Sequence, residues 1–140
     1  CHFVDLLRFL ADSPIIDCGG IKLSQNGTIT DDKTTVWLRF EDGSFGNIHY
    51  LANGHKSFPK ERLEIFCEGK ILQLDNFQKL RGFGWERFSK MNLWSQNKGY
   101  EKEIELVVDS MQKGIVAPIS FEEIIEVSRN TITAYERTLS

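Results

Sequence analysis

The sequence lacks the features by which several protein classes are recognised. Its three cysteines, Cys1, Cys18 and Cys67, are an odd number without a close pair, so a disulfide framework and a cysteine-rich zinc site are both unfavourable. No basic run is present that could follow a phosphate backbone. No apolar run approaches the length of a membrane span. We therefore expect a protein of the reducing cytoplasm that binds neither nucleic acid nor a membrane.

Also absent are the loops with which many enzymes hold nucleotides or activate a serine. The sequence contains no G-x-G-x-x-G between a strand and a helix, no P-loop and no G-x-S-x-G elbow. We therefore expect that this chain binds no dinucleotide, and that any hydride carrier is held elsewhere.

The composition is that of an ordinary globular domain. The 140 residues carry a formal net charge of -3, with 41% hydrophobic and 26% charged residues, values far from those of disordered or fibrous chains. Such a chain can bury about two thirds of the surface that its unfolded form exposes, and we predict a single domain over residues 1–140. Acidic residues near the C-terminus, such as Glu122, Glu123 and Glu126, are interspersed with apolar ones, which is typical of a solvated helix face.

The spacing of apolar residues predicts a helix at the start of the chain and a run of strands after it. The helix is indicated by apolar positions i, i+3, i+4 and i+7, namely Phe3, Leu6, Leu7 and Leu10. From residue 15 to about residue 93, apolar and polar residues alternate, as strands with one covered face require. Glycine-containing turns separate these strands at Asn26-Gly27, Asp42-Gly43 and Glu68-Gly69. Short connections of this kind join antiparallel neighbours.

Helical spacing returns after Trp94 and predicts two C-terminal helices. The first presents one apolar face and ends at Gly114; the face comprises Ile104, Val107, Val108 and Met111. The second begins at Ser120, where Glu123 completes a capping box. Its predicted inner stripe comprises Phe121, Ile124, Ile125, Ser128, Ile132 and Tyr135. We expect the two helices to pack together against the sheet.

The order of these elements predicts an α+β fold, with an open, mainly antiparallel β-sheet and helices packed on one face, one N-terminal helix and two C-terminal helices. The open face of the sheet would include Trp37, Phe66 and either Tyr50 or His49. Monomers rarely leave such large groups in water as a patch. We therefore expect a homo-oligomer, a dimer or a tetramer, formed through the open sheet face.

Three places in the sequence could carry chemistry. His2 and Asp5 are spaced i, i+3 on the first helix, which suits a general acid or base, although a surface or capping pair gives the same pattern. Lys98-Gly99-Tyr100 puts a cation and a phenol at a helix N-terminus, where a polar or anionic ligand can bind, or it simply starts the helix. Arg81-Gly82-Phe83-Gly84-Trp85 resembles a sugar-binding loop, and hairpin packing explains it nearly as well.

Two other interpretations of the reactive side chains are disfavoured. Cys1 could act as an N-terminal nucleophile with its own α-amine as base, but it begins inside a helical pattern, and no motif places an Asn or Asp partner. His49 and His55 could join His2 around a metal ion, but their spacing is not that of metal ligands. We expect no metal site.

Five segments, taken in their order, form a familiar pattern: residues 1–10, 36–44, 72–77, 98–103 and 118–128. Together they resemble the C-terminal domain of Gfo/Idh/MocA oxidoreductases, closest to the branch associated with bacterial polysaccharide biosynthesis. The resemblance implies a two-domain enzyme, in which a Rossmann domain binds NAD or NADP and this domain supplies a sheet for substrate binding and oligomerisation. It also implies that the Rossmann domain and the first strand of the usual sheet precede Cys1.

The resemblance implies oxidation or reduction of a sugar or nucleotide sugar at a hydroxyl or carbonyl carbon. His2 matches the family's histidine at the start of this helix, which implies proton transfer beside the nicotinamide. Asp5, Arg81, Lys98 and Tyr100 are the candidate substrate-binding residues, although relatives often carry histidine where Tyr100 stands. The family's Glu-Lys-Pro lysine belongs to the other domain, so we expect this chain to be inactive alone. The alternative is a non-enzymatic, dimeric, sheet-forming module that binds a ligand or a partner.

Overall fold

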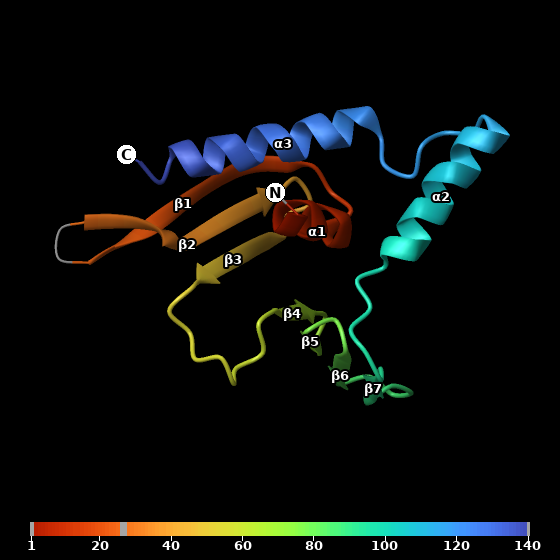
Figure 1. The fold of residues 1–140 in the computed structure, drawn as a ribbon, viewed down its shortest axis with the longest axis horizontal. Coiled ribbons are helices and arrows are strands. Elements are labelled where there is room, and N and C mark those ends of the chain that lie inside the picture. Colours follow the sequence, from red (N-terminus) through yellow and green to blue (C-terminus); the bar gives the residue numbers. More distant parts are fainter. Residues whose placement is uncertain (1, 26–27, 140) are drawn as a thin grey trace. The chain divides into compact units, whose positions relative to one another are not determined.

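The computed structural model describes residues 2–25 and 28–139. Its elements, in chain order, are α1 (His2–Ala11), β1 (Ile15–Gln25), β2 (Thr28–Phe40), β3 (Phe45–Leu51), β4 (Arg62–Cys67), β5 (Lys70–Asp75), β6 (Lys79–Phe83), β7 (Lys90–Asn92), α2 (Tyr100–Lys113) and α3 (Phe121–Glu136). Figure 1 shows these elements along the chain. The predicted α+β class, with antiparallel strands, one N-terminal helix and two C-terminal helices, is confirmed.

Hydrogen bonding divides the strands into two antiparallel sheets, of order β1-β2-β3 and β4-β5-β6-β7. The sequence predicted one sheet, because alternation shows which face a residue takes and not which strands pair. Contacts group the chain into two compact units. Unit 1 comprises the residues up to Asn53 and from Val116 onward, and unit 2 comprises Gly54–Ile115. One boundary falls in the polar loop after β3, and the other falls between α2 and α3.

Two of the predicted glycine turns are confirmed. At Asp42-Gly43 the glycine has φ 88°, and the Asp42 carboxylate accepts hydrogen bonds from the backbone and hydroxyl of Ser44 at 3.0 and 2.7 Å. Glu68 and Gly69 both have positive φ, 48° and 74°, which is the geometry of the tight hairpin turns that match strand twist. The third predicted turn, Asn26-Gly27, lies outside the described residues, although β1 and β2 pair as far as Gln25 and Thr28.

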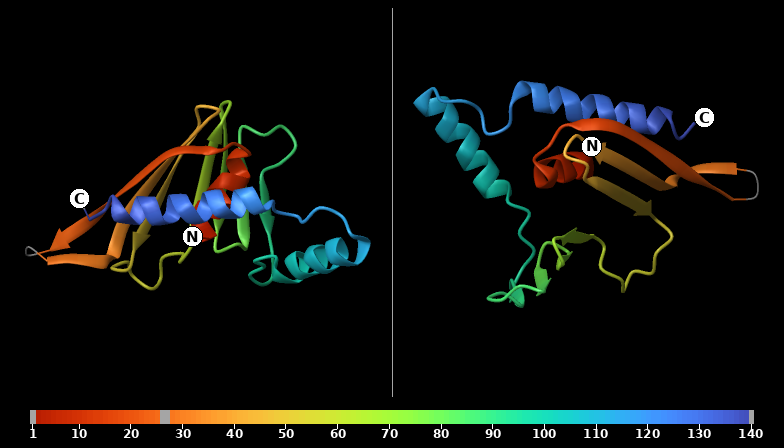
Figure 2. Two further views of the ribbon diagram at one scale, coloured as in Figure 1. Left: turned by 90° about the horizontal axis from the view of Figure 1, so that it is seen from above. Right: turned by 180° about the vertical axis from the view of Figure 1, so that it is seen from behind.

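Unit 1 buries its core between one face of its sheet and the helices α1 and α3. Its largest fully buried side chains are Leu38 and Cys18, which are joined by Val4 of α1 and by Val127 and Ala134 of α3. In this unit α3 packs along β1, while α1 contacts both α3 and β3, as Figure 2 shows from two sides. The predicted covering of one sheet face by helices therefore holds for α1 and α3.

The predicted inner stripe of α3 is wrong. Its large members are exposed: Phe121, Ile124, Ile125, Ile132 and Tyr135. The helix instead buries Val127 and Ala134, which are 4% and 1% exposed. The reason is close approach, because a Cβ added at Gly20 of β1 would lie 2.5 Å from the Thr138 side chain and 3.3 Å from the Ala134 carbonyl oxygen. Only small side chains fit between a helix and a strand at this distance.

The ends of the C-terminal helices follow the predicted capping rules. Gly114 closes α2 in the left-handed region with φ 62°. The Ser120 hydroxyl accepts a hydrogen bond from the Glu123 backbone at 3.1 Å and so starts α3. The predicted apolar face of α2, which includes Ile104 and Met111, is exposed. Because α2 belongs to unit 2 and α3 to unit 1, the packing of the two helices on each other stays a prediction.

Strand register decides which side chains occupy the open face of the unit 1 sheet. Trp37 lies there, with its indole over the backbone of Gly19, and so does His49, whose Nδ1 is 3.0 Å from the Thr35 hydroxyl. Tyr50 occupies the opposite face, because side chains alternate along a strand. Of the two candidates, His49 is therefore the open-face residue. Phe66 is exposed on β4 in unit 2.

Candidate functional site

His2 stands on the first turn of α1 with its side chain exposed. Its ring lies 4.4 Å from the ring of Phe3, centre to centre, at an interplanar angle of 47°. Asp5 follows one turn later and is half-buried. Among the described residues no hydrogen bond joins the His2 and Asp5 side chains. The helix therefore presents an accessible imidazole beside an aromatic ring, with a carboxylate one turn away on the same helix.

The helix that carries His2 is fixed to unit 1 by a half-buried ion pair. The Glu126 carboxylate of α3 accepts hydrogen bonds from Arg8 Nε at 3.1 Å and from the backbone N–H of Ile15 at 2.6 Å. One carboxylate thus joins α1, α3 and the start of β1. Sequence reasoning placed Glu126 on a solvated helix face, which is wrong, because its side chain is only 23% exposed. No local signal in the sequence indicates a partner 118 residues away.

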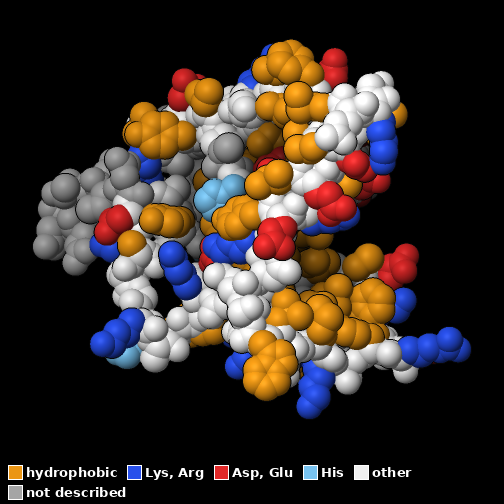
Figure 3. All heavy atoms as spheres, turned by 45° about the vertical axis from the view of Figure 1, so that its right-hand side comes forward, with side chains coloured by type: hydrophobic (Ala, Val, Ile, Leu, Met, Phe, Trp, Pro, Cys, Tyr) orange, Lys and Arg blue, Asp and Glu red, His pale blue; other side chains and the backbone are white. Residues whose placement is uncertain are grey.

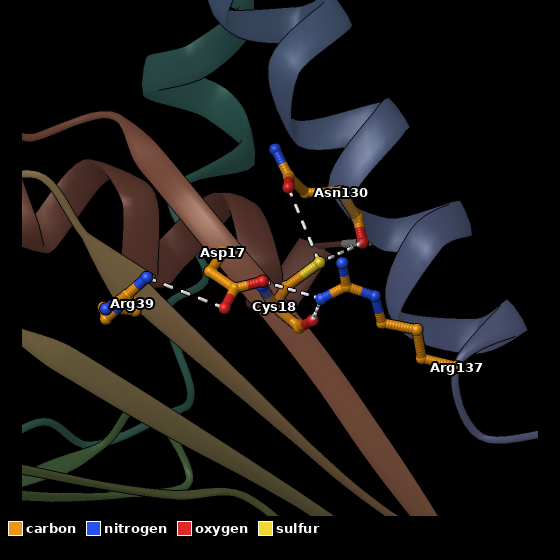
Figure 4. Close-up of polar contacts among 5 residues, drawn as sticks. All are labelled: Asp17, Cys18, Arg39, Asn130 and Arg137. Atoms are coloured by element: carbon orange, nitrogen blue, oxygen red, sulfur yellow. Dashed lines mark hydrogen bonds and ion pairs between the residues drawn. The ribbon is translucent and has the colours of Figure 1, made fainter. Parts of the chain in front are cut away.

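A second polar cluster lies at the edge of β1 (Figure 4). Arg137 donates to the Asp17 carboxylate at 2.6 Å and to the backbone carbonyl of Cys18, while Arg39 stands 3.7 Å from the other Asp17 oxygen. The hydrogen bond from Arg137 lowers the pKa of Asp17 and raises that of Arg137. Burial raises the pKa of the Cys18 thiol, which contacts the Asn130 carbonyl at 3.4 Å. These contacts fasten the end of α3 to β1, so the cluster serves the fold.

Of the predicted unit 2 residues, Lys98 has the most defined surroundings. Its ammonium donates to Glu61 at 2.8 Å and lies 5.6 Å from the ring centre of Phe77. The hydrogen bond to Glu61 raises the pKa of Lys98, so the amine remains charged at neutral pH. Sequence reasoning found Lys98 and missed Glu61, which is 37 residues away in the sequence.

Tyr100 is the first residue of α2 and is exposed. The N–H of Gly99, just before it, is already taken by the Asn97 side chain at 2.8 Å, so that one of the amides predicted to face a ligand has an internal partner. Tyr100 borders a shallow apolar groove of about 270 Å³ along α2, lined further by Glu103, Ile104, Val107 and Val108.

Arg81 lies exposed on β6, in register with Gln73 of β5. The glycine beside it, Gly82, is covered by the side chains of Phe88 and Trp85, 2.6 and 3.1 Å from the position of an added Cβ. The Trp85 indole N–H donates to the backbone carbonyl of Ile71 at 3.2 Å. The aromatic residue of the predicted sugar-binding loop is thus used for hairpin packing. Arg81 itself remains available on the strand surface.

The predicted site residues fall into both units, with His2 and Asp5 in unit 1 and Arg81, Lys98 and Tyr100 in unit 2. Cys1, the disfavoured nucleophile, lies outside the described residues. Among residues 2–25 and 28–139, no group of three or more His, Cys, Asp and Glu side chains is placed to hold a metal ion. Within the same residues, no helix is both long and apolar enough to cross a membrane.

The described strands do not fit a dinucleotide. All of their pairings are antiparallel, whereas the Rossmann cradle needs a parallel β–α–β unit with a glycine-rich turn leading into the helix. The two adjacent glycines of β1 serve packing instead, because Gly19 lies under the Trp37 ring and Gly20 lies under the end of α3. That this chain binds no coenzyme stays a prediction.

Charged side chains of both signs lie among exposed hydrophobic groups on the face drawn in Figure 3. Such a surface offers a ligand local charge pairs, like that of Lys98 and Glu61, instead of a field of one sign.

Solved structures share this fold. UDP-N-acetylglucosamine 3-dehydrogenase GnnA from Acidithiobacillus ferrooxidans matches with a TM-score of 0.78 and 16% identity, covering 99% of this chain and 46% of that one. An oxidoreductase from Agrobacterium radiobacter, solved with NAD+, L-tartaric acid and magnesium, matches with a TM-score of 0.75 and 15% identity, covering 99% and 45%. The WlbA dehydrogenase from Bordetella pertussis, solved with NADH and UDP-GlcNAcA, matches with a TM-score of 0.57 and 17% identity, covering 99% and 40%.

The chain shares its fold with these oxidoreductases, which agrees with the resemblance to the C-terminal domain of Gfo/Idh/MocA oxidoreductases noted in the sequence. This chain spans less than half the length of these structures. At such identities the likeness concerns the fold, and the chemistry has to be argued from side chains. No protein-family model and no curated protein sequence matches the chain.

Proposed function

We propose that the chain is the substrate-side domain of an NAD(P)-dependent oxidoreductase acting on a sugar or nucleotide sugar. The observation that carries the proposal is the agreement of fold over 99% of the chain with a UDP-N-acetylglucosamine 3-dehydrogenase. It is supported by an accessible histidine at the start of α1, the position at which the resembling family carries its proton-transfer group. Further parts of the proposal are a cytoplasmic location and a role in polysaccharide biosynthesis.

In this proposal His2 exchanges a proton with the reacting hydroxyl or carbonyl oxygen of the sugar. Imidazole is the side chain best suited to gain and lose a proton near neutral pH, and the His2 ring is exposed to a ligand. The Glu126 ion pair with Arg8 fixes α1 on the core of unit 1, so the imidazole is carried by an anchored helix. Asp5, one turn further on, contributes a negative charge near the ring.

Arg81, Lys98 and Tyr100 are proposed as substrate-binding groups. They offer a guanidinium, an ammonium and a phenol, which can donate to the hydroxyl or phosphate oxygens of a nucleotide sugar. The residues described here can bind the sugar, orient it and move its proton. Hydride chemistry belongs to whichever domain holds the coenzyme.

The open face of the unit 1 sheet supports a proposal of homo-oligomerisation. Trp37 is 41% exposed, Phe45 77% and Ile21 70%, and the register places all three on this face. The same observation favours the second candidate, a non-enzymatic dimeric module that binds a ligand or a partner. A complete gene that starts at Cys1 without a Rossmann segment would favour this second candidate over the first.

The experiment for the leading proposal uses the protein expressed from its complete coding sequence. Coenzyme reduction would be followed at 340 nm with UDP-N-acetylglucosamine as the probe substrate, for the parent protein, His2→Gln and His55→Gln. His55 is a matched control, because it is a loop histidine whose ring contacts only a neighbouring serine among the described residues. We expect His2→Gln to lower kcat/KM by about 100-fold or more, the usual contribution of a general acid or base.

Two results would overturn the proposal. One is equal activity of the His2→Gln and His55→Gln proteins, which would remove His2 from proton transfer. The other is tight binding of NAD or NADP by residues 1–140 alone in calorimetry, which would show that this chain is a coenzyme domain.

A further inference from the structure

Unit 2 contains a polar cavity that sequence reasoning did not find. It has a volume of about 320 Å³ and is lined by Lys60, Glu61, Asn76, Gln78, Gln96 and Lys98. We call it the Glu61 cavity. Its lining comes from the segment before β4, the turn between β5 and β6, and the segment before α2. Three parts of unit 2 therefore meet around one half-buried carboxylate, since the Glu61 side chain is 14% exposed.

Both oxygens of the Glu61 carboxylate have partners. Oε1 accepts from Lys98 at 2.8 Å and Oε2 accepts from Gln96 at 3.2 Å. The backbone of Glu61 is held as well, because its N–H donates to Asn76 Oδ1 at 3.1 Å and its carbonyl accepts from the Asn76 N–H at 2.7 Å. The carboxylate thus fixes the positions of an ammonium and an amide at the cavity wall.

The turn that supplies Asn76 and Gln78 is tightly constrained. Asn76 and Phe77 both have positive φ, 52° and 49°, as the two central residues of a type I′ turn require. A phenylalanine in this region is uncommon and persists only where the surroundings fix it. Here the Phe77 carbonyl accepts from the Asn97 N–H at 3.3 Å, which ties the turn to the segment that carries Lys98.

The amides of the cavity wall are arranged to present acceptors beside donors. Gln78 donates through Nε2 to the carbonyls of Leu93 and Trp94 at 3.1 and 3.2 Å, and Gln96 donates to Glu61. Among the described residues, these bonds use the amide nitrogen of Gln78 twice and that of Gln96 once, and they leave the two amide oxygens as acceptors. The remaining N–H groups of Lys98 and the Asn76 amide are donors. A hydroxyl group both donates and accepts, so this mixture suits a ligand with several hydroxyls.

The backbone carbonyl of Trp94 accepts a hydrogen bond from Gln78, which lines the cavity, so the chain at Trp94 passes beside it. Its side chain is fully exposed, at 103% of the reference area. An indole left wholly in water gains from covering its face with an apolar surface. The C–H face of a pyranose ring is such a surface, while the hydroxyls at the ring edge need hydrogen-bond partners.

We propose that the Glu61 cavity binds one pyranose ring, with Gln78, Gln96, Asn76 and Lys98 bonding to its hydroxyls and Trp94 stacking on its face. The volume is at the lower end for ligand pockets, enough for a single sugar ring and too small for a dinucleotide. Glu61 balances the charge of Lys98, and the exposed Lys60 leaves the lining with one further positive charge. The inference deepens the proposed function, on which it rests for the part of Lys98 in substrate binding.

The test is a titration of the ¹⁵N-labelled 140-residue chain with N-acetyl-D-glucosamine, followed by NMR. We expect saturable shifts of the Trp94 indole N–H and of the Gln78 and Gln96 amide signals, with a dissociation constant on the order of 1–10 mM, as a ligand of this size permits. Glycerol at equal concentration, a polyol without a ring, should leave these signals in place.

Variants distinguish stacking and hydrogen bonding in the cavity from non-specific binding. Trp94→Ala should weaken binding by about fivefold, while Trp94→Phe, which keeps an aromatic face, should retain most of it. Gln96→Leu should weaken binding, and Gln112→Leu on the exposed surface of α2 is its matched control. The Trp94 side chain makes no buried contact, so its variants should keep the dispersed spectrum of the folded chain. Shifts that do not saturate, or that persist unchanged in Trp94→Ala and Gln96→Leu, would overturn the proposal.

The outcome is separable from that of the proposed function, because the titration needs neither coenzyme nor turnover. If the titration saturates but His2→Gln does not change the rate of coenzyme reduction, sugar binding in the Glu61 cavity is supported and the proposed proton transfer by His2 is rejected. A silent titration in a protein with His2-dependent turnover keeps the proposed function and rejects the cavity.

Discussion

The substitution Gly20→Ala tests how closely α3 lies on β1. The added Cβ would stand 2.5 Å from Thr138 Cγ2, 3.0 Å from the Thr35 carbonyl oxygen and 3.3 Å from the Ala134 carbonyl oxygen. Gly20 is not one of the glycines with positive φ, so alanine at this position introduces no backbone strain. The whole cost is steric, and two of the three contacts are with backbone atoms that cannot turn away.

The expected loss of stability follows from these contacts. Forcing a methyl group into a packed interface costs about 1–3 kcal/mol. Replacing glycine by alanine also restricts the unfolded chain, which returns about 0.4–1 kcal/mol. We therefore expect Gly20→Ala to lower the free energy of unfolding by about 1–2 kcal/mol, measured by urea unfolding with far-UV circular dichroism.

The neighbouring glycine provides the control. A Cβ at Gly19 would meet the Trp37 indole at 2.6 Å, but this ring is on the open sheet face and 41% exposed, so it can move aside. Gly19→Ala should cost less than about 1 kcal/mol. Thr138→Ser removes the methyl group nearest to Gly20 and keeps the hydroxyl that bonds to the backbone of α3. The double variant should therefore recover part of the Gly20→Ala loss.

The close helix–strand contact would be refuted if Gly20→Ala were no more destabilising than Gly19→Ala. It would also be refuted if Thr138→Ser recovered nothing, since the shortest contact would then have no energetic weight.

Two further predictions concern α3 and its C-terminal attachment. Val127 is buried, and Val127→Ala should lower the free energy of unfolding by about 1–3 kcal/mol. Ile132 is exposed, and Ile132→Ser should change it by no more than about 0.5 kcal/mol. If urea unfolding gave the reverse order, the inner stripe predicted from the sequence would be correct after all. Because the hydrogen bond from Arg137 lowers the pKa of Asp17 below its ordinary value of 3.8, the carboxylate stabilises the folded chain above that value, and the contribution disappears as the pH falls through the folded pKa. The urea midpoint of the parent chain should therefore fall more steeply below about pH 4 than that of Asp17→Asn, and parallel curves would contradict this account.

The local features of the fold could be predicted because a few adjacent residues decide them. Asp42-Gly43 makes its turn through an aspartate that bonds two residues onward, and Ser120 starts α3 through a bond three residues onward. Gly114 ends α2 because it tolerates positive φ. Alternation likewise gave the strands, since one face of each is covered.

The inner face of α3 could not be predicted from its own sequence. Its most hydrophobic stripe includes Ile124 and Ile132, and a hydrophobicity pattern selects these residues for the core. The strand beneath the helix carries glycine at position 20, so the helix comes close and buries Val127 and Ala134 instead. The decision depends on a residue more than a hundred positions away in the sequence, which no window of helical periodicity includes.

The candidate site was predictable only where one residue type was itself suggestive. His2 and Lys98 were found because an imidazole and an ammonium near helix starts have recognisable uses. Glu61 and Glu126 were missed because their partners, Lys98 and Arg8, are distant in the sequence. A carboxylate in a helix or loop usually faces water, and only the folded chain shows that these two are shielded and paired.

The agreement of fold with known dehydrogenases and the arrangement of side chains bear on different questions. At 16% identity a backbone path can be retained while most side chains differ, so the shared path supports a common architecture and not a common substrate. In our proposals the substrate is recognised by the Glu61 cavity, whose carboxylate, amides and ammonium are held by contacts within unit 2. The proposed proton transfer depends on His2, whose helix is held by contacts within unit 1. Because each group is positioned inside its own unit, a substitution in one should leave the geometry of the other intact, and sugar binding and turnover can be lost one at a time.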